Sequence, residues 1–357
     1  MKICFFIADI CGRGGTERVT SLVANGLVER NFMVDIVTCR GSGKSFFMLQ
    51  KQVQVFSLHS DKILNPVLRM VHNFKCLWKI VKNRDYNVVI AVDISLYLYL
   101  FPLQLAKKCK CIAWEHFNYY ISSTGYTKIA RHLAVKYADY VIVLGKHDLK
   151  SYRQHYPKAK KLTYIYNPVA FEKSNPENIG RHRIIAVGRL MEQKGFDLLI
   201  EAWKIIERNK PDDDWVLDIY GEGELGEELQ GKITKYRLKR CHLKGYTEDI
   251  ETEMRSSSLF VLSSRYEGFV LVLLEAQSKG LPCVSFNCKE GPAEVIDNGV
   301  NGFLAEDGNI KDLAQKMQMV MYNDKLRKSF SEKAQKDLGR FRVDLIINKW
   351  AGLLWKI

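Results

Sequence analysis

Two glutamates eight residues apart, Glu267 and Glu275, form the strongest chemical feature of the sequence. Glu267 precedes an apolar run at 270–274, and Glu275 follows that run directly. A carboxylate in such a segment is costly to bury unless a hydrogen-bond donor meets it. A ribose diol or a sugar hydroxyl is such a donor, and the free amides of a helix beginning at 269–271 would favour a phosphate. The alternative is an exposed helical glutamate at 275.

Two cations follow an apolar segment at 183–188: Arg189 directly after it and Lys194 five residues further on. Arg189 leaves the end of the expected strand, and Lys194 begins the expected next helix. A guanidinium fork and an ammonium point charge can hold a diphosphate between them. A pair of solvated surface cations is the competing interpretation.

A glycine-rich turn, Gly12-Arg13-Gly14, follows the first expected strand and precedes a helix. Such a turn lets a phosphate approach the backbone closely. It matches a dinucleotide-binding fingerprint only in part, because Glu17 occupies the third glycine position and the second strand ends at Arg40 without an acidic ribose partner. A nicotinamide site is therefore the less favoured alternative. An ordinary strand-to-helix turn also remains open.

His116 follows an apolar strand in the first half of the chain. A histidine at the carboxyl end of a strand can carry a proton or donate a hydrogen bond, although a lone histidine also serves structural roles. Asp212, Asp213 and Asp214 follow Pro211 and indicate a solvated turn, so the sequence predicts no metal site.

Alternating apolar strands and amphipathic helices must position these residues, which predicts doubly wound parallel sheets covered on both faces. In the first half we expect strands near 2–9, 33–39, 52–58, 87–93, 110–115, 139–144 and 162–166, with helices such as 16–30 and 124–137. In the second half we expect strands near 183–188, 215–220, 241–245, 259–263, 282–286 and 302–304, and helices at 194–209, 222–239, 270–279, 309–322 and 324–338.

A polar, proline-containing stretch through Asn167, Pro168 and 172–178 is the expected linker between two α/β domains. The domains are then 1–170 and 171–340. Ligands of open parallel sheets bind outside the carboxyl ends of the strands, so the cleft between the two domains is the expected site. The apolar end of the chain, 343–355, could pack on either domain.

Charge separates the two halves. Residues 1–170 hold 25 Lys and Arg against 10 Asp and Glu, whereas the remainder is nearly neutral. Such an excess favours an anionic partner for the first half. Nine cysteines without a CxxC pair indicate reduced thiols in the cytoplasm, and no apolar run reaches the roughly 20 residues of a membrane span.

Together these segments resemble the retaining GT-B glycosyltransferases of family GT4 (group 1) over nearly the whole chain. The E-x7-E element from Glu267 to Glu275, preceded by Arg189 and Lys194, is the most specific part. The turn at 14–19 and the loop at 289–294 resemble the bacterial exopolysaccharide, amylovoran-type subgroup. The resemblance implies a GT-B fold, two Rossmann-like domains facing across a cleft, with a terminal helix at about 341–357 crossing back to the first domain.

The resemblance also implies roles for individual residues. Glu267 and His116 would lie beside the reacting sugar as the catalytic pair. The donor ligands would be Gly15, Arg189, Lys194, Tyr246, Phe269, Val270, Leu271 and Glu275. The family often has glycine where this chain has Val270, whose side chain narrows the sugar pocket without removing the backbone donors.

The activity implied by the resemblance is metal-independent, retaining transfer of a hexose or N-acetylhexosamine from a UDP-sugar, without a cofactor. The acceptor would be a polyprenyl-diphosphate-linked oligosaccharide in capsule, exopolysaccharide or O-antigen biosynthesis. We expect a peripheral enzyme at the cytoplasmic face of the cell membrane, bound to anionic lipid through basic stretches such as 67–82 and 100–110, and no nucleic-acid partner. The alternatives are a GT-B nucleotide-sugar 2-epimerase and a non-catalytic nucleotide- or glycan-binding protein.

Overall fold

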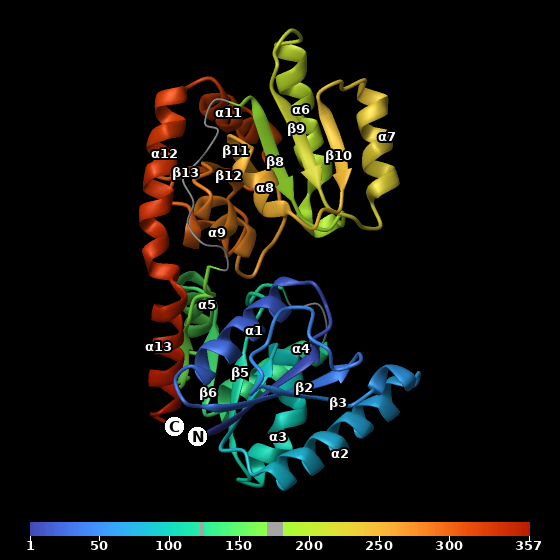
Figure 1. The fold of residues 1–357 in the computed structure, drawn as a ribbon, viewed down its shortest axis with the longest axis vertical. Coiled ribbons are helices and arrows are strands. Elements are labelled where there is room, and N and C mark those ends of the chain that lie inside the picture. Colours follow the sequence, from blue (N-terminus) through green and yellow to red (C-terminus); the bar gives the residue numbers. More distant parts are fainter. Residues whose placement is uncertain (122–124, 170–180) are drawn as a thin grey trace. The chain divides into compact units, whose positions relative to one another are not determined.

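Two parallel β-sheets organise the chain, one in each of the two units into which it divides (Figure 1). The computed structural model describes residues 1–121, 125–169 and 181–357. The first unit is Met1–Pro168 with Phe341–Ile357, and the second unit is Val169–Arg340. The 172–178 part of the expected linker lies outside the described residues.

The first unit contains a seven-stranded sheet of order β3-β2-β1-β4-β5-β6-β7, and each neighbouring pair is parallel. The strands are β1 (Lys2–Asp9), β2 (Met33–Arg40), β3 (Gln54–Ser57), β4 (Val88–Val92), β5 (Lys110–Trp114), β6 (Tyr140–Val143) and β7 (Leu162–Tyr164). The helices are α1 (Gly15–Val28), α2 (Pro66–Arg84), α3 (Tyr97–Leu105), α4 (Gly125–Tyr137), α5 (Lys146–His155) and α13 (Val343–Leu354), with short 3-10 turns at Ser60–Lys62 and Ile94–Leu96.

Both faces of this sheet are buried, which is why its strands are apolar throughout. Cys4 and Phe6 on β1 belong to a core with α2, α3, α4 and α5. The intervening Phe5 points to the opposite face, where its ring lies 6.4 Å from that of Trp350 on α13. Neighbouring side chains of β1 therefore point in opposite directions and pack against the helices on the two faces of the sheet.

The end of the chain packs on the first unit. Ile347 of α13 lies so close to Gly26 of α1 that a Cβ there would come within 2.6 Å of it. Arg30 donates hydrogen bonds to the Asn348 side chain and the Asp344 carbonyl. The glycine thus lets the two helices approach closely, and the last helix completes one face of the first sheet.

The second unit contains a six-stranded parallel sheet of order β10-β9-β8-β11-β12-β13. Its strands are β8 (Arg183–Val187), β9 (Val216–Tyr220), β10 (Cys241–Gly245), β11 (Leu259–Leu262), β12 (Cys283–Phe286) and β13 (Gly302–Ala305). Its helices are α6 (Phe196–Asn209), α7 (Gly226–Tyr236), α8 (Ile250–Arg255), α9 (Leu271–Ser278), α10 (Pro292–Val295), α11 (Ile310–Met321) and α12 (Asp324–Asp337), with 3-10 turns at Glu192–Lys194 and Leu338–Phe341.

The expected fold class of two doubly wound parallel-sheet domains is confirmed, and the differences lie at element ends. The helix expected at 222–239 is shorter, because Gly221 and Gly223 form a turn pressed against the end of β8 before α7 begins. The basic stretch at 67–82 forms most of one long helix, α2. Within the described ranges, no helix combines the length and apolar character needed to cross a bilayer.

Candidate active site

The carboxyl edge of the second sheet carries the E-x7-E element. Glu267 lies in the loop after β11, and Glu275 lies on α9; their exposed fractions are 6% and 8%. The exposed alternative for Glu275 is therefore wrong. Burial of two carboxylates at the ligand-binding edge of a parallel sheet requires polar partners, which suits a polar ligand.

An ion pair joins Glu267 to Lys194. The Lys194 ammonium donates a hydrogen bond of 2.7 Å to Glu267 Oε1, and the Ser264 hydroxyl donates one of 2.6 Å to the same oxygen. Lys194 ends a 3-10 turn, whereas the sequence predicts it at a helix start; Gly195 separates it from α6. The lysine chain passes over Gly188, where a Cβ would lie 3.2 Å from it.

The turn carrying Lys194 and the loop carrying Glu267 are held together by further bonds. Arg265 donates two hydrogen bonds of 2.7 Å to the Asp197 carboxylate and one to the Glu192 carbonyl. Burial alone would raise the pKa of Asp197, but the bonds from Arg265 outweigh it and lower that pKa. The Ser263 hydroxyl donates to the Lys194 carbonyl at 2.9 Å. These bonds fix the distance between the ammonium and the carboxylate.

Arg189 follows β8 at the same edge, and its side chain is exposed. Among the residues that the structure describes, its guanidinium has no ion-pair or hydrogen-bond partner. The adjoining backbone is crowded, since a Cβ on Gly221 would lie 1.9 Å from the Gly188 carbonyl oxygen. Because Gly221 has no side chain, the backbones after β8 and β9 can lie side by side. The exposed Arg189 guanidinium next to them is available to an anion.

A shallow pocket opens at the ends of β8, β9 and β10, beside the close approach of Gly188 and Gly221. It is lined by residues that include Leu190, Glu222, Leu243 and Gly245. Tyr246 follows Gly245 directly and is 46% exposed. A flat apolar wall beside an exposed aromatic ring suits a nucleobase.

The start of α9 lies against the loop after β12. Val270 precedes the helix without a side-chain cap, Phe269 and Val270 are buried, and Leu271 is partly exposed. The Leu271 N–H bonds to the Phe269 carbonyl at 3.1 Å, so it is already used. Within the described part of the chain, the N–H groups of Val270 and Val272 have no such partner and are the amides available to a phosphate.

Gly15 and His116, the two first-unit candidates, both follow strands at the carboxyl edge of the first sheet. Gly15 is the exposed first residue of α1, after the turn that leaves β1. His116 follows β5 and is 8% exposed. In the sheet, β4 alone separates β1 from β5.

Burial lowers the pKa of His116 to about 3, so its imidazole is neutral at physiological pH. Its ring lies 4.3 Å from that of Trp114, and Nε2 finds no hydrogen-bond partner among the described residues. A neutral imidazole can exchange hydrogen bonds with a sugar hydroxyl. This environment opposes the proton-carrier interpretation and favours the hydrogen-bonding one.

A buried polar cluster holds the backbone around His116. Tyr152 donates a hydrogen bond of 2.6 Å to the Glu115 carboxylate, and Arg131 lies 3.4 Å from the same oxygen. Arg131 also donates to the carbonyls of Tyr119 and Asn118. Burial raises the pKa of Glu115 to about 7, with a smaller contribution from Asp93, while Arg131 and Tyr152 oppose the rise. The cluster fixes the loop after β5.

Sequence reasoning did not single out Ser264, Asp197 or Gly291 as parts of the site. Ser264 lies three residues before Glu267, a spacing that could have signalled a local hydrogen bond. Gly291 has φ +86°, and a Cβ there would lie 3.1 Å from both Glu267 and Val270. Asp197 gave no signal, because its partner Arg265 is 68 residues away in sequence.

Comparisons with known proteins identify the family of the chain. A model of glycosyl transferases group 1 matches residues 170–337, and one of glycosyltransferase family 4 matches residues 13–173. The amylovoran biosynthesis glycosyltransferase AmsD of Erwinia amylovora is 28% identical over 99% of both chains.

Two further proteins are similar over their full lengths. The GalNAc-α-(1→4)-GalNAc-α-(1→3)-diNAcBac-PP-undecaprenol α-1,4-N-acetyl-D-galactosaminyltransferase of Campylobacter jejuni is 25% identical over 100% of this chain and 99% of its own. A Staphylococcus aureus TarM variant, in complex with UDP among other ligands, superimposes with a TM-score of 0.81 at 18% identity over 99% of both chains. This likeness supports the GT-B fold. Matched in both halves, the chain belongs to the group 1 glycosyltransferases of family GT4.

Proposed function

We propose that this glycosyltransferase moves a hexose or N-acetylhexosamine from a UDP-sugar to a lipid-linked oligosaccharide with retention of anomeric configuration. The observation that carries the proposal is the grouping of Lys194, Glu267 and Arg189 at one sheet edge, with a 2.7 Å ion pair between the first two. In this proposal the two cations bind the diphosphate, and the neighbouring carboxylate binds the sugar.

The proposed step breaks the bond between the anomeric carbon and the diphosphate oxygen, whose electron pair leaves with the diphosphate. Arg189, Lys194 and the amides at the start of α9 stabilise the charge that develops there, which lowers the barrier. The acceptor hydroxyl attacks from the same face and gives its proton to the departing diphosphate. No enzymic nucleophile and no metal ion take part.

The other residues orient the donor in this proposal. Glu275 accepts hydrogen bonds from the ribose, and Tyr246 lies against the base. Glu267 and His116 hold sugar hydroxyls in the reactive geometry. Gly15, having no side chain, lets the backbone at the start of α1 approach the phosphates.

UDP as the nucleotide and a polyprenyl-diphosphate-linked acceptor are supported by relatives rather than by residues of this chain. The TarM variant was crystallised with UDP. The Campylobacter jejuni relative is named for an undecaprenyl-diphosphate-linked substrate, and AmsD for amylovoran biosynthesis. We therefore infer a role in bacterial surface polysaccharide biosynthesis, at the cytoplasmic face of the membrane.

The basic first unit also offers a surface for anionic lipid. On α2, Val67 and Leu68 are 64% and 61% exposed, and Lys75, Lys79 and Lys82 are exposed further along the helix. An apolar patch next to cations suits the lipid interface. The fraction of protein that sediments with phosphatidylglycerol vesicles should fall steeply as the salt concentration rises. Equal, weak binding to neutral and to anionic vesicles would contradict this surface.

A thermal-shift panel of nucleotide sugars, followed by transfer assays with the stabilising donor, tests the proposed function. We expect Arg189→Ala, Lys194→Ala and Glu267→Ala each to lower kcat by about 100-fold or more, whereas the exposed control Lys311→Ala keeps full activity. Full activity in the first three variants would overturn the site. Release of free epimerised sugar without any acceptor would favour the 2-epimerase.

The same assay tests the proposed independence from metal ions. Dialysis against EDTA should leave the initial rate unchanged, because Arg189, Lys194 and the helix amides supply the positive charge. A rate lost in EDTA and restored by Mg²⁺ or Mn²⁺ would show that a divalent cation carries this role.

A further inference from the structure

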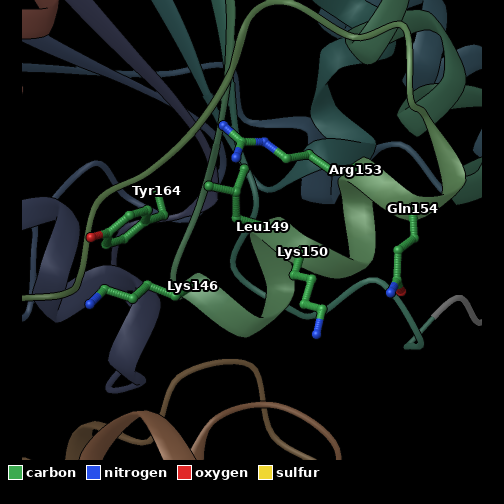
Figure 2. A pocket seen from close by; sticks show the side chains of 6 residues that line it. All are labelled: Lys146, Leu149, Lys150, Arg153, Gln154 and Tyr164. Atoms are coloured by element: carbon green, nitrogen blue, oxygen red, sulfur yellow. The ribbon is translucent and has the colours of Figure 1, made fainter.

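A cationic pocket lies between α5 and β7 of the first unit (Figure 2). Leu149 and Tyr164 form its apolar part, and Lys146, Lys150, Arg153 and Gln154 surround them. Figure 2 shows the Lys146 and Arg153 side chains extending to the side on which Tyr164 lies, whereas Lys150 and Gln154 extend away from it. The lining contains three cations and no acidic residue.

No acidic side chain pairs with the cations of this pocket among the described residues. In the part of the chain that the structure describes, Lys146, Lys150 and Arg153 form no ion pair, whereas Arg84 and Lys110 pair with aspartates. Asp148 is the acidic residue of α5, but it is buried and accepts the Tyr119 N–H. Positive charges spaced along one helix repel one another, so a bound anion would relieve a real electrostatic cost.

A further cation approaches from the C-terminal helix. The ammonium of Lys349 on α13 lies 5.7 Å from the centre of the Tyr164 ring. The Tyr164 ring therefore lies near cations of two helices, α5 and α13. Two helices distant in sequence converge their positive charge on the end of one strand.

The pocket opens at the functional edge of the first sheet. Tyr164 ends β7, and Lys146 begins α5 directly after Gly145, which provides no side-chain cap. His116 follows β5, and β6 alone separates β5 from β7. At about 4.8 Å between neighbouring strands, the two strand ends lie roughly 10 Å apart. Tyr164 and His116 therefore belong to the same edge of the first sheet.

We propose that this pocket binds the diphosphate that links the acceptor glycan to its lipid carrier. The proposal rests on the proposed function and deepens it, because it assigns the acceptor's anionic group to Lys146, Arg153 and the surroundings of Tyr164. An arginine fork with lysine point charges matches phosphate oxygens, and several cations match the multiple charges of a diphosphate. Leu149 and the Tyr164 ring provide an apolar wall beside it.

Calorimetric titration with farnesyl diphosphate, at saturating UDP so that the donor site is occupied, tests the pocket. We expect the double variant Lys146→Ala and Arg153→Ala to raise Kd about tenfold or more, corresponding to at least about 1.4 kcal/mol. The matched control, Lys158→Ala with Lys160→Ala, removes the same charge from exposed lysines that follow α5 and should change Kd less than twofold. Farnesol should not bind measurably.

Three results would overturn the inference: equal Kd in the pocket variant and the wild type, equal weakening in the control, or equal binding of farnesol. Loss of phosphatidylglycerol vesicle binding in the pocket variant with unchanged farnesyl diphosphate binding would assign the pocket to lipid headgroups instead. Titrations with UDP-sugars alone test the proposed function separately. A chain that binds no nucleotide sugar but shows pocket-dependent farnesyl diphosphate binding would lose that function and retain this site.

Discussion

Burial determines how two adjacent side chains after β5 ionise. Glu115 is 1% exposed and His116 is 8% exposed. Desolvation penalises the charged form of each, which raises the pKa of Glu115 to about 7 and lowers that of His116 to about 3. At neutral pH the strand end therefore presents a neutral imidazole, and Glu115 is the member of the pair that titrates.

This ionisation predicts the pH dependence of a His116 variant. We expect His116→Asn to lower kcat by about 10–100-fold, through loss of an orienting hydrogen bond. Because the imidazole stays neutral above pH 5, the variant should keep the shape of the wild-type pH–rate profile between pH 5.5 and 8. An inflection near pH 6.5 that disappears in the variant would show that His116 titrates during turnover.

Glu115 predicts a pH dependence of stability. Its pKa is raised from 4.5 to about 7 on folding, so the folded chain holds its proton more tightly than the unfolded chain. The resulting stabilisation is full below pH 4.5 and is lost as pH rises through about 7. Relative to Glu115→Gln, the wild-type free energy of unfolding should fall by about 1–3 kcal/mol over this range. Urea unfolding at several pH values measures the difference, and a constant difference would contradict it.

At the scale of elements, the site depends on a turn pressed against a loop. Gly195 joins the Lys194 turn to α6 with φ +60°, and a Cβ there would lie 2.1 Å from the Ser263 carbonyl oxygen. The Ser263 hydroxyl in turn bonds to the Lys194 carbonyl. The close approach of two backbones, which only glycine permits, brings Lys194 to Glu267.

We therefore expect Gly195→Ala to destabilise the chain by about 3 kcal/mol or more, from backbone strain and displacement of the loop. Gly308 provides a matched control, since it has φ +70° and nothing within 4 Å of a Cβ. Gly308→Ala should cost only about 1–2 kcal/mol and leave donor binding unchanged. Thermal unfolding and UDP-sugar titration compare the two variants. Equal losses of stability and of donor binding in both would show that the close approach at Gly195 has no special role.

At the scale of the whole molecule, the last twelve-residue helix belongs to the first unit although it follows the second in sequence. Trp350 of α13 is fully buried, and its ring centre lies 4.7 Å from that of Trp114. Trp114 in turn lies against His116. The end of the chain thus supports the strand that carries a candidate catalytic residue.

Trp350→Ala should leave a large cavity and destabilise the first unit by about 3–5 kcal/mol. Hydrogen exchange followed by mass spectrometry should then accelerate in peptides of 1–168 and remain unchanged in peptides of 181–340. Trp355→Ala, at a residue 65% exposed on the same segment, should have a much smaller effect. Faster exchange confined to the second unit would contradict the assignment of α13.

The order of strands and helices, the two parallel-sheet domains and the E-x7-E element follow from the sequence, because they depend on local apolar periodicity and on spacing along the chain. Periodicity shows that a helix has an apolar face but not which surface covers that face, so 343–355 could be read as packing on either domain. The composition of 67–82 likewise shows a basic, apolar stretch, whereas its place on the long helix α2 comes from the structure.

Contacts between distant segments were decided only by the tertiary structure. Lys194 and Glu267 are 73 residues apart, and they meet because β8 and β11 are neighbours in the sheet. The cations of α5 and Lys349 of α13 converge on Tyr164 for the same reason, that strand order and helix packing bring remote segments together. The pKa of His116 likewise depends on burial by residues far away in sequence, which no local pattern contains.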